Sequence, residues 1–202
     1  MSFIFPARIR NELNRFEDRT GIPITLIFNL LVLLLSPNPL VKAAALIGAI
    51  MSGVETHVKK GSRKFTLPAS AWNLIDQFIE ENNFPYRRNY NKIITYRDAN
   101  LASDTTGMTF QNRIYLQSIP SNNKELSEFF HEYVHTFQYH RYGQIVFIPV
   151  YVGEYLFELV RQRNAQEAYE NIEFEDQAFD WEERFLDWLN ARGIWVHKVR
   201  PS

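Results

Sequence analysis

Two apolar runs dominate the hydrophobic pattern near the start of the chain. Ile22–Leu35 and Leu40–Val54 contain a single charged residue, Lys42, and the breaker Ser36-Pro-Asn-Pro39 separates them. Each run is shorter than the roughly 20 residues that an upright helix needs to cross a bilayer. The pattern predicts a hydrophobic helical hairpin over residues 22–56, which either dips into one leaflet of a membrane or packs as two helices of a soluble core.

Basic residues flank this hairpin on both sides. In the leader, residues 1–21, arginines alternate with apolar residues at a spacing that predicts a basic amphipathic helix after Pro6. By the positive-inside tendency both flanks would lie in the cytoplasm, so we expect membrane association with the rest of the chain facing the cytoplasm. The alternative is a soluble cytoplasmic protein. A cleaved signal peptide fits the acidic residues of the leader less well. The second basic group follows the hairpin, at Lys59, Lys60, Arg63 and Lys64.

An ordinary globular pattern begins at about residue 64, and we expect one domain over residues 64–202. Apolar residues at helical spacing after Pro68 predict an amphipathic helix. The segments 93–96 and 108–117 have the pattern of strands and predict an antiparallel pair. Residues 122–190 have the pattern of helices joined by short loops. The predicted class is therefore α+β, with helix in excess in the C-terminal half.

The composition limits the size of the core, the partners and the possible metal ligands. A chain of 202 residues that is 46% apolar can bury one sizeable core. Its 23 acidic and 22 basic residues nearly cancel, so no overall field favours a nucleic acid as partner. The chain contains no cysteine, so any metal must be held by His, Asp or Glu.

One predicted helix carries a metal-binding motif. Asn122, with Glu125 three residues later, has the spacing of a helix N-cap and its reciprocal carboxylate, and Gly143 is a natural helix end. The helix between them contains His131-Glu-x-x-His135. Because residues four apart lie above one another on a helix, the two imidazoles can bind a single ion.

This spacing is typical of zinc hydrolases. Glu132 is turned away from His131 by about 100 degrees, so it can reach a metal-bound water without itself binding the metal. Zinc lowers the pKa of that water toward neutrality, and Glu132 would act as catalytic base and later protonate the leaving amine. On a helical wheel the two histidines lie opposite the apolar arc, so the metal face and the core face are separate.

A catalytic zinc needs a third protein ligand. In the helix predicted over residues 174–190, most acidic side chains point outward, whereas Glu175 and Glu182 fall within the apolar sector. A buried carboxylate is costly unless it is paired or binds a metal. Either residue could form a salt bridge with a buried arginine, and for Glu182 we favour that interpretation.

The chain resembles the gluzincins, zinc metallopeptidases with His-Glu-x-x-His on one helix and a glutamate ligand on a later one. The likeness is closest to the small bacterial minigluzincin-like group. It rests on His131–Gln138, Thr106–Leu116 and Tyr169–Ala178, and it covers roughly residues 93 to 180. The resemblance implies a zincin-like fold, in which a small antiparallel sheet packs on the active-site helix, with Glu175 as the third ligand of one zinc ion.

The resemblance also implies that the strand ending near Leu116 is an edge strand, on which a peptide substrate lies extended. An Asp directly after the Ala of the glutamate motif is common in related peptidases, whereas here Phe179 precedes Asp180, so support of a zinc-binding histidine by Asp180 stays open. We expect His140 to be a packed or rim histidine, because it lies nearer the apolar arc. Candidate donors to an oxyanion are Tyr133, Tyr139, Tyr142 and Tyr169.

The resulting hypothesis is a zinc-dependent hydrolase, a metallopeptidase that cleaves a peptide or protein substrate. Its metal ligands would be His131, His135 and Glu175, and its base Glu132. The alternative is a non-catalytic zinc-bearing or membrane-associated binding protein on a peptidase-like scaffold. The presence of Glu132 favours the enzyme, because a purely structural zinc site has no use for a carboxylate at that position.

Overall fold

The structure is a computed structural model that describes residues 24–85, 93–103 and 105–194. The chain forms two compact units, residues 1–60 and residues 61–202. The second unit contains the sheet and the predicted metal-binding motif, so most of the functional argument concerns it.

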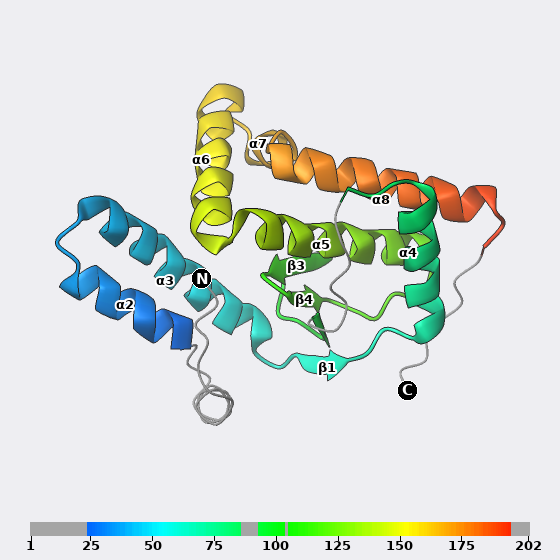
Figure 1. The fold of residues 1–202 in the computed structure, drawn as a ribbon, viewed down its shortest axis with the longest axis horizontal. Coiled ribbons are helices and arrows are strands. Elements are labelled where there is room, and N and C mark those ends of the chain that lie inside the picture. Colours follow the sequence, from blue (N-terminus) through cyan, green and yellow to red (C-terminus); the bar gives the residue numbers. More distant parts are fainter. Residues whose placement is uncertain (1–23, 86–92, 104, 195–202) are drawn as a thin grey trace. The chain divides into compact units, whose positions relative to one another are not determined.

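The first unit contains two helices, α2 (Ile24–Leu35) and α3 (Pro39–Lys59), which pack side by side (Figure 1). The breaker separates them, and Asn38 donates its N–H to the Ser36 hydroxyl at 3.2 Å. Pro39 begins α3, where a missing backbone N–H costs nothing. The two apolar runs therefore form the two helices of a hairpin. The amphipathic helix predicted for the leader, residues 1–21, lies outside the described residues.

The second unit has α+β architecture with helix in excess, as predicted. The helices predicted after Pro68, after Asn122 and over residues 174–190 are all present. The elements follow in the order β1 (Arg63–Phe65), α4 (Ala69–Glu81), β2 (Ile94–Arg97), β3 (Gly107–Phe110), β4 (Arg113–Leu116), α5 (Asn123–Tyr142), α6 (Gln144–Gln162), α7 (Ala165–Glu170) and α8 (Glu173–Ala191).

The sheet differs from the predicted antiparallel pair. Its four strands lie in the order β1-β2-β4-β3, and β2 pairs with β4 in parallel, with Thr95 opposite Ile114. The prediction of one strand over residues 108–117 was wrong, because the chain reverses at Gln111, where φ is 59°. The segment is therefore a β-hairpin of β3 and β4, and the reversal makes β4 parallel to β2. The sheet is mixed rather than antiparallel.

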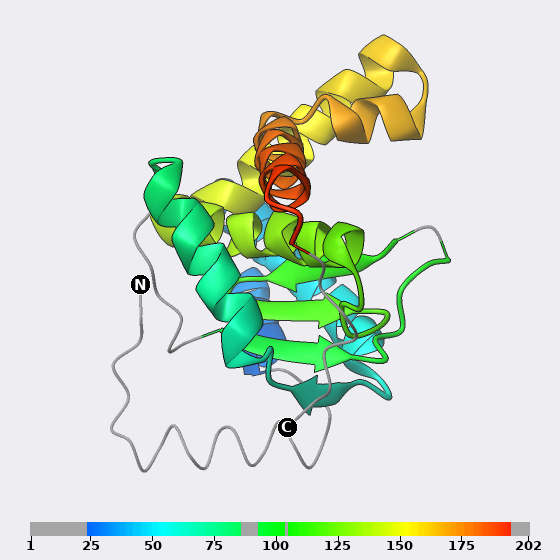
Figure 2. The ribbon, with the colours of Figure 1, turned by 90° about the vertical axis from the view of Figure 1, so that its right-hand side faces the viewer.

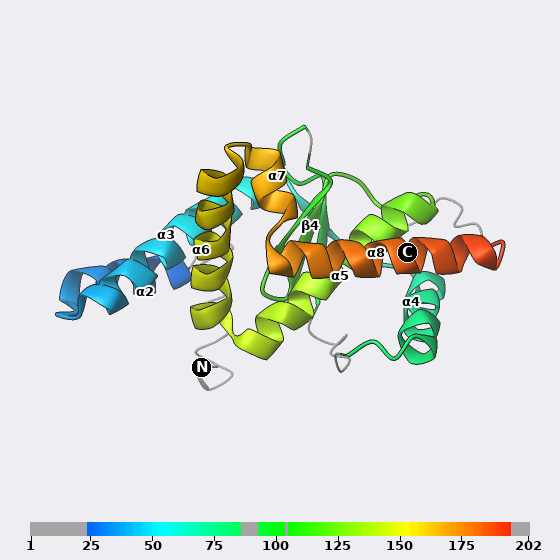
Figure 3. The same ribbon diagram turned by 90° about the horizontal axis from the view of Figure 1, so that it is seen from above.

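Helix α5 lies between the sheet and α8. Figures 1 and 2 show three layers within the second unit, the sheet, then α5, then α8, and α5 packs on both β3 and α8. Seen from above in Figure 3, α8 crosses α5 obliquely, and α6 and α7 form the connection between them. Because both of its neighbours are apolar layers, α5 is buried along nearly its whole length.

Aromatic side chains from α4, α5 and α8 form the centre of the core. Phe78, Phe130 and Phe185 are fully buried, and their ring centroids lie 4.8 to 5.4 Å apart. Aromatic pairs at these separations stabilise a core beyond the burial of their area. The cluster fixes α8 against α5 and so sets which side chains of the two helices face each other.

No single helix among the described residues is both long enough and apolar enough to span a membrane. One bent pair, α5 with residues 146–162 of α6, meets the length and composition limits together, and its two parts meet at 117°. Helix α5 in that pair is the buried core helix of the second unit.

Candidate metal centre

The sequence around Asn122 starts α5 in the predicted way. The Asn122 side chain accepts a hydrogen bond from the Glu125 N–H at 3.0 Å. The Glu125 carboxylate returns to the preceding turn, where it accepts the Ser121 N–H at 2.7 Å. Gly143 ends the helix with φ 72°, a conformation that favours glycine. Both ends of the motif-bearing helix are therefore set by local sequence.

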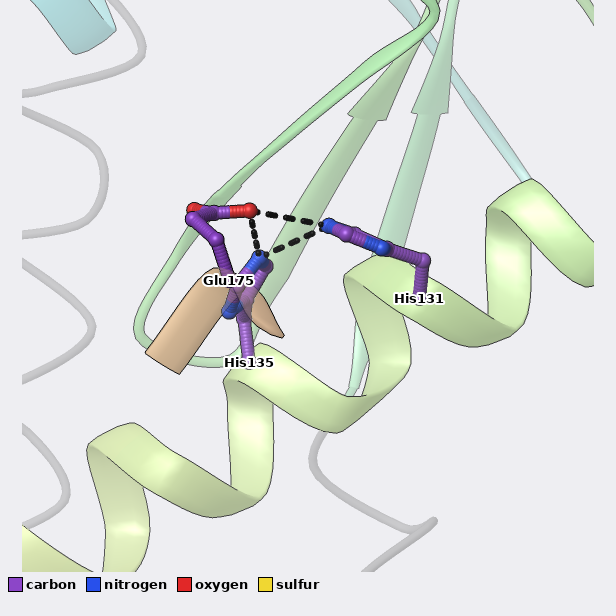
Figure 4. Close-up of side chains that lie close together, drawn as sticks. All are labelled: His131, His135 and Glu175. Carbon is purple, nitrogen blue, oxygen red and sulfur yellow. Dashed lines mark hydrogen bonds and ion pairs between the residues drawn. The ribbon is translucent and has the colours of Figure 1, made fainter. Parts of the chain in front are cut away.

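Three ligand atoms converge at the interface of α5 and α8 (Figure 4). The Nε2 atoms of His131 and His135 lie 3.1 Å apart. The Oε2 atom of Glu175 lies 3.1 Å from His131 Nε2 and 3.4 Å from His135 Nε2. All three side chains are buried. The three residues predicted as metal ligands lie close together and could bind a metal ion.

The spacing of these atoms suits a small divalent cation. Ligand atoms that lie about 2.0 to 2.2 Å from a tetrahedral metal are separated from one another by roughly 3.3 to 3.6 Å. The three observed separations, 3.1, 3.1 and 3.4 Å, are close to that range. Two imidazole nitrogens and one carboxylate oxygen also form a donor set that suits transition metals better than calcium or magnesium.

Gln138 orients His135. Its side-chain oxygen accepts a hydrogen bond from His135 Nδ1 at 2.7 Å, and its nitrogen donates to the Phe174 carbonyl at 2.9 Å. Because the amide oxygen can only accept, His135 carries its proton on Nδ1, which leaves Nε2 free to bind a metal. Gln138 also ties α5 to the residue before Glu175, so one side chain positions two of the three candidate ligands.

Glu182 lies beside Nδ1 of His131, as Gln138 lies beside Nδ1 of His135. Its carboxylate lies 3.1 Å from His131 Nδ1, an ion-pair contact without the alignment of a full hydrogen bond. Glu182 therefore pairs with His131, and the predicted salt bridge to a buried arginine was wrong. The heptad spacing of Glu175 and Glu182 explains this, because both fall on the face of α8 that covers α5. Asp180 is exposed and pairs with Arg184 instead.

Two tyrosines hold the Glu175 carboxylate. Tyr151 of α6 donates to Oε1 at 2.6 Å, and Tyr169 of α7 donates to Oε2 at 2.7 Å. Burial, and then the charge of Glu175, raise the pKa of both phenols, which stay protonated as donors. Of the four tyrosines considered from sequence, Tyr169 reaches the cluster, whereas Tyr133 packs in the aromatic core. Tyr151 was missed, since no spacing relates it to the motif.

Burial and charge oppose each other at the ligands. Burial disfavours the charged form of His131, but the carboxylates of Glu175 and Glu182 raise its pKa to about 10. Burial also disfavours protonation of His135, and the Glu175 charge raises that pKa nonetheless. Burial disfavours ionisation of Glu175, yet the two histidines hold its pKa well below the usual range. The carboxylate is thus anionic and needs positive charge beside it.

Glu132 lies on the sheet side of α5. The Thr109 hydroxyl is within hydrogen-bond distance of both the Glu132 carboxylate, at 2.7 Å, and the Glu132 carbonyl, at 2.9 Å. A Cβ placed on Gly107 would lie 2.6 Å from Glu132 Cγ, so only glycine leaves room for this side chain. Burial raises the pKa of Glu132, against the lowering effect of the two histidines. Strand β3 therefore positions the predicted base.

The free edge of the sheet nearest the site belongs to β3. The family resemblance implied that the strand ending near Leu116 is the edge, but that strand, β4, pairs on both sides. This correction follows from the reversal at Gln111, which divides the predicted strand into an inner and an outer half. Glu132 contacts the outer half, β3, through Gly107 and Thr109.

A groove with a volume of about 320 Å³ opens beside the start of α5. It reaches Thr106, which precedes Gly107, and Glu128, which lies one helical turn before Glu132. The ligand residues themselves are not part of its wall. The residues that form it are Thr106, Leu116, Gln117, Ser118, Pro120, Asn122, Lys124, Glu125 and Glu128.

Comparison with known proteins leaves the family open. The chain matches no family model, and neither the curated proteins nor the solved structures include a significant match. The case for a metal centre therefore rests on the geometry of the cluster itself.

Replacing Glu175 by Gln should abolish tight metal binding. The amide has the same shape but loses the charge and is a much weaker ligand. Metal content per chain, measured after exposure to Zn²⁺ and gel filtration, should fall from near one to near none. Asp176→Asn is the matched control, because Asp176 is the exposed neighbour on the same turn. Full metal content in Glu175→Gln would show that Glu175 is not a ligand.

Replacing Gln138 by Ala should weaken metal binding about 10- to 100-fold without abolishing it, since loss of an outer partner of a ligand histidine has effects of that size. Competition with a chromophoric chelator measures the change. Gln138→Glu keeps an acceptor for His135 Nδ1 and should recover part of the affinity. Gln166→Ala, on the exposed face of α7, is the control. Unchanged affinity in Gln138→Ala would contradict the assigned role.

Proposed function

We propose that this chain is a zinc-dependent hydrolase of zincin-like fold, a metallopeptidase that cleaves peptide bonds. The observation that carries the proposal is the convergence of His131, His135 and Glu175 on one side of α5 while Glu132 contacts β3 on another. A structural zinc site needs ligands only, whereas a hydrolase also needs a base beside them. The gluzincin resemblance supports the same assignment.

Zinc is the proposed metal because of the donor set. Two imidazoles and one carboxylate form a three-ligand set of the kind that leaves a fourth position open in catalytic zinc sites. Bound there, zinc would supply Lewis-acid chemistry, polarising a carbonyl and lowering the pKa of a coordinated water. Gln138 and Glu182 would hold the two imidazoles with Nε2 toward the ion.

Glu132 would provide the proton transfers. Its carboxylate accepts a proton from the attacking water and donates it to the amine that leaves, so the proton count balances over one cleavage. The Thr109 hydroxyl fixes the orientation of Glu132, and Gly107 leaves the space that its side chain occupies. Tyr151 and Tyr169 keep the Glu175 carboxylate in place.

The proposed substrate is an extended peptide. Strand β3 is the outer strand of the sheet and carries the residues that contact Glu132, so a peptide paired to its free edge would run past the base. The groove that begins at Thr106 continues from the same end of β3 and offers space for side chains of the peptide.

One observation favours the alternative of a zinc-bearing protein that binds without cleaving. The ligands are 2 to 6% exposed and Glu132 is 8% exposed, so the site is nearly closed to a substrate. In the enzyme a segment beside the site must therefore open before a peptide can reach the base. Activity, rather than metal content, separates the two functions.

The Glu132→Gln variant tests the enzyme directly. It should bind zinc as tightly as the wild type and lose roughly 10²- to 10⁴-fold in turnover, because only the proton transfers are removed. Cleavage of a peptide library, followed by mass spectrometry, measures this, with Glu183→Gln as control, because Glu183 is exposed on α8 and does not line the groove. Equal cleavage by wild type and Glu132→Gln would refute the base, and zinc binding without any cleavage by wild type would support the binding protein.

Gly107→Ala tests the role of the edge strand in positioning Glu132. The added methyl group would overlap the Glu132 side chain, so we expect at least a roughly tenfold loss of turnover with metal affinity retained, since a misplacement near 1 Å can cost much of the rate. Gly153→Ala is the matched control, because a Cβ there meets nothing within 4 Å. A loss of zinc from Gly107→Ala would point to a structural role instead.

A further inference from the structure

The α2–α3 hairpin exposes the kind of side chain that a soluble helix pair buries. Large apolar side chains are exposed over much of α2 and along one stripe of α3, and the two residues at the turn, Leu34 and Leu35, are 75% and 78% exposed. A soluble hairpin turns such side chains inward. The exposed members are Ile27, Phe28, Leu30, Leu31, Leu34 and Leu35 of α2, and Leu46, Ile50 and Val54 of α3.

Small and polar residues occupy the interior of the hairpin instead. Gly48 of α3 faces Asn29 of α2 so closely that a Cβ on Gly48 would lie 2.5 Å from the Asn29 amide nitrogen. Ala45, Ala49 and Ser52 lie on the same face of α3 as Gly48 and are buried. Small residues between helices with large apolar residues outside are the arrangement of helices packed in lipid.

The hydroxyl groups in α3 bond to their own helix. The Ser52 hydroxyl donates to the Gly48 carbonyl and the Thr56 hydroxyl donates to the Ser52 carbonyl, both at 2.8 Å. Hydrocarbon offers a hydroxyl group no water as a hydrogen-bond partner. These bonds within the helix supply that partner instead. The hairpin can therefore leave water without an unsatisfied hydroxyl at these positions.

Charge is divided unevenly along the chain. Residues 1–64 contain nine Lys and Arg against four Asp and Glu, whereas residues 65–202 contain 13 against 19. The near-zero net charge of the whole chain conceals this difference. A surface with negative charge would attract the end that carries the hairpin and repel the acidic remainder.

We propose that the α2–α3 hairpin inserts into one leaflet of an anionic lipid bilayer, with Leu34 and Leu35 in the hydrocarbon and Lys59, Lys60, Arg63 and Lys64 at the headgroups. Helix α2, with 12 residues, is about 18 Å long and α3, with 21 residues, about 31 Å, against about 30 Å for the hydrocarbon of a bilayer, so the tip stays within one leaflet when the hairpin enters obliquely. Lys42 lies one turn after the tip, and its long side chain reaches the headgroups only if the hairpin is oblique. This proposal does not depend on the metal centre.

Flotation of the full chain with vesicles tests the proposal. The wild type should float with phosphatidylcholine vesicles that contain phosphatidylglycerol and float less with phosphatidylcholine alone or at high salt. The double substitution Leu34→Glu and Leu35→Glu should reduce the bound fraction by roughly tenfold or more, because charge is costly in hydrocarbon. Val160→Glu is the control, since Val160 on α6 is 79% exposed, as much as Leu35. Circular dichroism shows whether each variant is folded.

Site-directed labelling keeps the test independent of those substitutions. The chain has no cysteine, so Leu35→Cys and Val160→Cys can each carry one environment-sensitive fluorophore. Anionic vesicles should shift the emission of the label at 35 to the blue and leave that at 160 unchanged. No flotation of the wild type, equal flotation of the double variant, or equal shifts at both positions would overturn the proposal. So would a dimer that the tip substitutions dissociate without any lipid binding, which would assign the face to a second copy.

Discussion

The Glu175 carboxylate is the group on which the arrangement of the second unit depends. It is 2% exposed, and a charge so far from water is tolerated only with partners around it. Two histidines of α5, Tyr151 of α6 and Tyr169 of α7 all contact its oxygens. Side chains from three helices therefore meet the carboxylate of a fourth. A divalent cation would compensate the same negative charge.

The layered fold brings two faces of α5 into contact with different elements. His131 and His135 are one turn apart and face α8, whereas Glu132 is about 100 degrees away and faces β3. Because α5 lies between two layers, neighbouring residues in the sequence contact different elements. The α8 side supplies Glu175 and Glu182 beside the histidines, and the sheet side supplies Thr109 and the space left by Gly107. A helix with one covered face would leave either Glu132 or the two histidines in water.

The first unit follows a different physical rule. In the second unit the aromatic cluster of Phe78, Phe130 and Phe185 is inside, and most charges are on the surface. In the hairpin small and polar residues of α3 are inside, and Leu30, Leu31, Leu34, Leu35 and Leu46 are exposed. The hairpin therefore distributes small and large side chains in the opposite way to the core of the second unit.

Local rules were enough to predict a large part of this structure. The N-cap at Asn122, the helix end at Gly143 and the spacing of His131 and His135 all depend on residues within a few positions of each other. The inward direction of Glu175 followed from its place on the α8 wheel, although its choice as a ligand needed the family resemblance.

The remaining features were decided by tertiary structure. The parallel pairing of β2 with β4 depends on a reversal at Gln111, a residue that gives no strong turn signal. Glu182 and His131 are in contact although 51 positions separate them in the sequence. Tyr151 and Glu175 are 24 positions apart, and Gly107 and Glu132 are 25 apart. Sequence alone determined which helices form and which side chains could bind a metal. Only the packing of the layers decided which of them meet, because contact across layers depends on geometry that no local spacing encodes.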